Sequence, residues 1–119
     1  MTNDPLKNLS ALITEAHTRI QQAHTDINPV VSVRRGMRDN GIPADAMTID
    51  CLRTGKRIVL ILHDQQPNEL IYQLTMIDHD SSADFKQVTL STVTVEMLFE
   101  WMRDYFSADY EPARAAWNP

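Results

Sequence analysis

The sequence predicts an α+β fold in which two helices precede an antiparallel sheet of four strands and a third helix follows it, in the order α-α-β-β-β-β-α. Near both ends of the chain, apolar residues recur every three or four positions, which is typical of one side of a helix. Between Met47 and Leu90, apolar and polar residues alternate, as they do along strands. Two turn-forming segments, 53–56 and 64–68, divide this stretch, and both place the apolar residues on the same face.

The first expected helix runs from Pro5 to about His24. Asp4 can cap it, and proline is tolerated at the first helical position. The apolar side chains recur along it at Leu6, Leu9, Ile13, Ala16, Ile20, Ala23 and Ile27. We expect this stripe to pack on the sheet. Because the spacing also fits heptads, a dimer-forming seam is the alternative.

A second helix is predicted from Pro29 to about Asp39. Asn28 before the proline repeats the start signal, and Asn40-Gly41 forms a glycine C-cap pattern. Valine is a mediocre helix former, so we expect tertiary contacts to hold this valine-containing helix in place.

The strands are expected to form a meander whose faces follow from the two turns. With Thr54-Gly55 as a tight loop, Ile49 faces Leu60, and closing the second turn pairs Leu60 with Tyr72. One face then collects Met47, Ile49, Cys51, Ile58, Leu60, Leu62, Leu70, Tyr72, Leu74 and Met76. A slip of one residue would swap the faces, and a bulge at Gly55 would cause one.

The fourth strand, from Phe85 to Leu90, follows a polar loop. Closing this loop symmetrically puts Val88 beside Leu74, Leu90 beside Tyr72 and Lys86 beside Met76. That pairing again places Val88 and Leu90 on the core face.

The third helix is expected from Thr94, its cap, to about Ser107. It carries two adjoining apolar stripes, which consist of Val95, Leu98, Phe99, Met102 and Phe106, and of Met97, Trp101 and Tyr105. One sheet face cannot cover both stripes, so the second should meet the first helix or another chain. We assign residues 1–107 to a single domain and 108–119 to a tail in which Trp117 is the large apolar residue.

Composition restricts the function. The chain has 119 residues and a formal net charge of −5, which argues against broad binding to nucleic acid or to an anionic membrane. No apolar run approaches the ~20 residues that span a bilayer. The single cysteine, Cys51, falls on the expected core face and fits a reducing cytoplasm.

We expect no metal site, no cofactor and no catalytic residue. His63 and His79 lie beside opposite ends of the third strand, roughly 25 Å apart at ~3.3 Å per residue. The motif of a nucleophilic serine is missing, and three glycines are too few for a phosphate-binding loop. We expect Asp78, His79 and Asp80 to meet Lys56 and Arg57 across the strand ends instead.

Basic residues concentrate between positions 34 and 57. The anion-binding candidates are Arg34, Arg35, Arg38, Lys56 and Arg57, and Arg53 lies among them. A solvated face is the simpler interpretation. The alternative is a binding protein for nucleic acid or for a phosphorylated, anionic ligand.

The candidates for a protein interface are apolar residues that exceed what one core can bury. They are Val59, Ile61 and Ile71 on the second face of the sheet, and Met97, Trp101 and Tyr105 on the third helix. We therefore expect a non-enzymatic protein-interaction module (an adaptor, chaperone-like or regulatory protein) that is cytoplasmic and forms a homodimer.

Overall fold

The computed structural model of the chain describes residues 5–24, 27–77 and 85–107. It confirms the α+β class and the antiparallel sheet, but within these residues the sheet has five strands and one helix precedes it. The elements are α1 (Pro5–Ala23), β1 (Val30–Arg34), α2 (Gly36–Asp39), β2 (Ala44–Cys51), β3 (Lys56–His63), β4 (Glu69–Met76), β5 (Lys86–Thr89), the 3-10 turn η1 (Leu90–Thr92) and α3 (Val95–Phe106).

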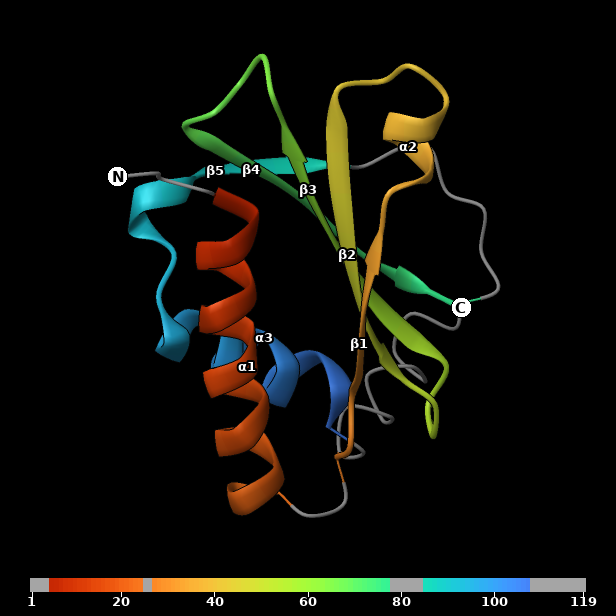
Figure 1. Ribbon diagram of the computed structural model, residues 1–119. Helices are drawn as coiled ribbons and strands as arrows, with labels where there is room; N and C mark the ends of the chain where they lie inside the picture. The colour runs from red at the N-terminus through yellow and green to blue at the C-terminus, as the bar shows by residue number, and fades with distance from the viewer. Residues whose placement is uncertain (1–4, 25–26, 78–84, 108–119) are drawn as a thin grey trace.

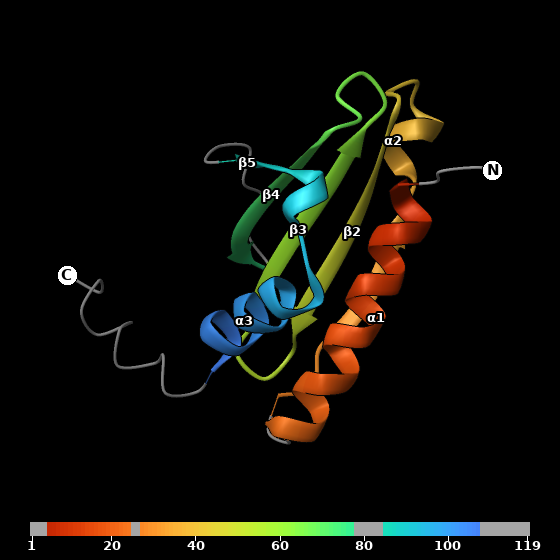
Figure 2. The same ribbon diagram turned by 90° about the vertical axis from the view of Figure 1, so that its left-hand side faces the viewer.

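The five strands form a meander in the order β1-β2-β3-β4-β5, with each neighbour antiparallel. The sheet is strongly twisted, and α1 and α3 lie side by side on one face of it (Figures 1 and 2). The molecule therefore has two layers, with both long helices on the same side.

The predicted helix from Pro29 to Asp39 is wrong. Val30–Arg34 form β1, which pairs with β2, and only the single turn Gly36–Asp39 is helical. β-Branched valines favour a pleated, half-buried surface, and the free edge of β2 supplies one. The stop signal was correct, because Gly41 adopts a φ of 87° just after α2.

The first hairpin is paired two residues away from the prediction. Cys51 lies opposite Lys56 and Ile49 opposite Ile58, which leaves a loop of residues 52–55. Gly55, at φ 76°, closes this loop by donating its N–H to the carbonyl of Cys51 at 2.8 Å. An even shift keeps every side chain on its predicted face, so the predicted core survives the error.

The second hairpin is confirmed, with Leu60 opposite Tyr72 and Ile58 opposite Leu74. The last strand is displaced by four residues, because Val88 lies opposite Leu70 and Lys86 opposite Tyr72. Segment 78–84 contains neither glycine nor proline to define a turn, so sequence symmetry was a poor guide to the pairing. Leu90 lies beyond the strand, in η1.

The core lies between the helices and the sheet face that they cover. Its most deeply buried side chains include Leu9, Ile13, Ile20, Met47, Ile49, Ile58, Leu60, Leu70, Leu98, Met102 and Phe106. The apolar stripe of α1 is thus buried within the chain, as expected from the prediction that it packs on the sheet. Leu74 departs from the prediction with 46% of its surface exposed, and Tyr72 and Met76 are half-buried.

Candidate functional site

The side of the sheet that points away from α1 and α3, here called the far face, carries apolar residues. Val59 and Ile61 of β3 and Ile71 of β4 point to it because they alternate with the core residues of their strands. Ile61 lies directly opposite Ile71, and all three side chains are half-buried. The structure therefore places these three predicted interface residues together.

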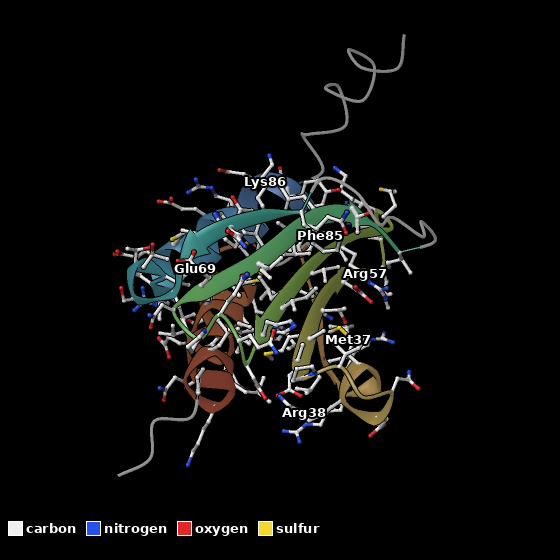
Figure 3. The ribbon with its side chains drawn as sticks, turned by 90° about the horizontal axis from the view of Figure 1, so that it is seen from above. Met37, Arg38, Arg57, Glu69, Phe85 and Lys86 are labelled. Atoms are coloured by element: carbon white, nitrogen blue, oxygen red, sulfur yellow. The ribbon has the colours of Figure 1, made fainter. Side chains whose placement is uncertain are left out.

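A hollow of about 570 Å³ opens on the far face. Met37 and Phe85 lie on the side of the sheet away from α1 and α3 (Figure 3). The residues that line this far-face hollow are Met37, Ala44, Ile61, His63, Ile71, Phe85 and Gln87. Phe85 keeps 40% of its surface exposed, although it is a large aromatic residue.

The predicted interface included Ile61 and Ile71 but none of the other residues that line the hollow, among which Met37 and Phe85 are the large apolar ones. Met37 fell within the predicted helix from Pro29 to Asp39, of which only the turn Gly36–Asp39 forms, and Phe85 was taken as the start of the fourth strand. A large aromatic residue directly after a polar loop is a weak signal of an exposed anchor. Nothing in the local sequence connects it with Met37, which is far away along the chain.

The predicted anion-binding residue Arg57 is held by a carboxylate beside the hollow. Arg57 lies opposite Asp50 on the far face, and its Nε and Nη2 donate to the two carboxylate oxygens at 2.7 and 2.8 Å. The hydrogen bond with Asp50 raises the pKa of Arg57. This bidentate pair places a neutralised polar group on the far face.

Arg38 connects α2 to the end of the sheet. It donates to both oxygens of Asp45 and to both oxygens of Asp64, each at 3.0 Å. These hydrogen bonds raise the pKa of Arg38, and the one from Arg38 lowers the pKa of Asp64. Because Met37 precedes Arg38 in α2, this clamp positions one wall of the far-face hollow.

The structure does not bring the five basic candidates together on one surface. Lys56 is 6% exposed and points to the helix-facing side, where its Nζ lies 5.3 Å from the centroid of the Tyr105 ring. Arg34 ends β1, and Arg35 lies 3.9 Å from a carboxylate oxygen of Asp45. Arg34 and Arg38 both fell within the predicted helix from Pro29 to Asp39, but they belong to different elements, β1 and α2.

The aromatic stripe of α3 contacts the chain's own sheet. Trp101 stacks on Tyr72, with ring centroids 4.6 Å apart and an interplanar angle of 28°. The hydroxyl of Tyr105 donates to the carbonyl of Thr75 at 2.9 Å, and Met97 packs against the core. These three interface candidates therefore have partners in β4 or the core, although they remain half-buried.

Two of the histidines within the described ranges contact backbone groups. His17 Nε2 lies 2.6 Å from the carbonyl of Pro29, and the N–H of Gln65 donates to His63 Nδ1 at 3.2 Å. Residues 5–24, 27–77 and 85–107 contain no group of three His, Cys, Asp or Glu side chains that would hold a metal ion. The predicted ion cluster at 78–80 and Trp117 lie outside the described residues.

Comparison of the chain with family models, with curated proteins and with solved structures finds no match. Within the described part of the chain, no helix has both the length and the apolar character needed to cross a membrane.

Proposed function

We propose that the protein is a non-enzymatic protein-interaction module, an adaptor, chaperone-like or regulatory protein, that works in the cytoplasm as a homodimer. One observation supports this above all others. Both long helices lie on one side of the sheet, and the far face carries an apolar hollow built from three separate parts of the chain. An apolar surface with a polar rim is typical of a site for another protein.

The shape of the hollow favours a polypeptide over a small molecule. Ligand sites for small molecules are usually enclosed and contain a few precisely placed polar groups. Here the floor is formed by Ile61 and Ile71, the walls by Met37 and Phe85, and the hollow is open to solvent. Methionine and aromatic residues are enriched in protein interfaces, where they fill pockets between partner side chains.

The alternative, a binding protein for nucleic acid or for an anionic ligand, has weaker support. Arg38 and Arg57 already neutralise carboxylates of the chain, and Lys56 lies under the helix layer. An anion would have to displace Asp45, Asp64 or Asp50 from charge-assisted hydrogen bonds.

Site-specific photo-crosslinking in the expressing cell tests the proposal. A benzoylphenylalanine at position 61 should form discrete adducts with another protein. The matched control is position 52 in the first hairpin loop, where Leu52 is 70% exposed and therefore more accessible than Ile61. We expect no discrete adduct there.

A second substitution checks that the adduct depends on the hollow. Ile71→Glu in the crosslinking variant should abolish the adduct, because a charge on the floor would be desolvated by any partner. Far-UV circular dichroism should stay native, since Ile71 is only half-buried. Equal labelling at positions 52 and 61, or a wild-type protein that stays monomeric by mass in solution, would contradict the proposed function.

A further inference from the structure

β1 forms one edge of the sheet and is unusually apolar for such a strand. Among the described strands it pairs with β2 alone, so its second row of backbone N–H and C=O groups points away from the sheet. Val30 and Val33 leave 44% and 49% of their surfaces exposed, on opposite faces. An exposed edge of this kind is a template for pairing with another strand.

The opposite edge of the sheet differs from β1. β5 has four residues and begins with Lys86, a charge of the kind that protects natural edges. β1 has five residues, and its only charge is Arg34 at the end. Protection by charge is thus absent from the first four positions of β1, where valine dominates.

We infer that a second copy of this chain adds its own β1 to this edge. The two strands run antiparallel, with Ser32 opposite Ser32 of the partner subunit. This inference rests on the homodimer proposed above, and it places the contact between the copies at the strand edge, away from the far-face hollow.

The sequence of β1 suits pairing with itself in this register. Val31 lies opposite Val33 of the partner subunit, and the reverse pair repeats the contact on the helix-facing side. Contacts between directly opposed side chains of this kind stabilise antiparallel sheets. Both exposed valines of β1 then gain a neighbour. Val33 contacts Val31 of the partner subunit, and Val30 contacts Arg34 of the partner subunit.

Charge and proline disfavour the neighbouring registers. With Ser32 at the centre, the two Arg34 residues are about 13 Å apart along the strands at ~3.3 Å per residue. That distance exceeds the Debye length of about 10 Å at 0.1 M salt. A register centred nearer to Arg34 than Ser32 is brings the two guanidinium groups together. A register centred before Ser32 brings Pro29 into the ladder, and proline has no N–H to donate.

Disulfide trapping tests the register. Directly opposed residues in antiparallel strands have Cα atoms about 4.5–5.5 Å apart, within the range that a disulfide spans. Ser32→Cys should therefore give a covalent dimer under mild oxidation. Val30→Cys is the matched control, because its two copies would be about 13 Å apart at ~3.3 Å per residue although the site is well exposed. The native Cys51 is 1% exposed and stays in both variants.

A charged substitution tests the edge without new cysteines. Val33→Lys should convert the dimer to a monomer, as measured by analytical ultracentrifugation. The far-UV circular dichroism should stay native, because about half of the Val33 surface is already exposed in the single chain. A wild-type dimer that survives Val33→Lys, or equal crosslinking of Ser32→Cys and Val30→Cys, overturns the edge pairing but leaves a homodimer standing. A monomeric wild-type protein overturns both.

Discussion

Replacing Leu60 with alanine tests the register of the central strand together with the helix layer above it. Leu60 is 1% exposed and lies opposite Met47 on one side and Tyr72 on the other. Core Leu→Ala substitutions cost about 2–5 kcal/mol, and the cost rises with the volume of the cavity that remains. Sheet neighbours flank Leu60 on both sides and the helix layer covers it, so little can collapse inward. We expect a loss of about 4 kcal/mol in the free energy of unfolding.

Urea denaturation followed by circular dichroism measures this loss. The matched control is Leu74→Ala, the same chemical change on the same sheet face, where the side chain is 46% exposed. Because roughly half of its surface is already in water, we expect about 1 kcal/mol there. The m-value should stay unchanged in both variants. Equal losses for the two variants, or a loss at Leu60 below about 1.5 kcal/mol, would refute the burial pattern described above.

Three further predictions concern polar contacts. Thr94→Ala should lower the free energy of unfolding by about 1 kcal/mol in urea, because the cap of α3 at 3.1 Å is lost, whereas Thr94→Asn should preserve it. Asp64 has a lowered pKa through Arg38, so its contribution to stability is present above its ordinary pKa of about 3.9 and is lost as the pH falls. The difference in melting temperature between wild type and Asp64→Asn should therefore shrink below about pH 4 and persist at pH 7. Asp50→Asn should cost about 2 kcal/mol because it leaves the mostly buried Arg57 without its carboxylate, and adding Arg57→Met should recover part of that loss.

The faces of the sheet could be predicted from the sequence although two registers could not. Alternation has a period of two, so any even error in pairing leaves each side chain on its correct face. The first hairpin is displaced by two residues and the last by four, and both errors are even. Gly55 identified the turn but not its length, because glycine at a positive φ serves both a two-residue loop and the last position of a longer loop.

The first strand could not be predicted because local signals conflict there. Asn28-Pro29 and Asn40-Gly41 bracket the segment as they would a helix, whereas the valines between them favour a strand. The free edge of β2 decides between the two, and that edge exists only once the sheet has formed. The same reason hides the far-face hollow, since Met37 and Phe85 line one hollow only once the sheet has formed.

Pairing of β1 across a two-fold axis has a consequence for the proposed interaction surface. Directly opposed residues of an antiparallel pair point to the same side of a sheet. The two far faces would therefore lie on one side of a continuous ten-stranded sheet, and all four long helices on the other, since each subunit contributes five strands and two long helices. A partner with two apolar segments would then engage both hollows, and the second contact would be intramolecular. Self-association at the edge would thus strengthen binding at the far face without adding a single contact to either hollow.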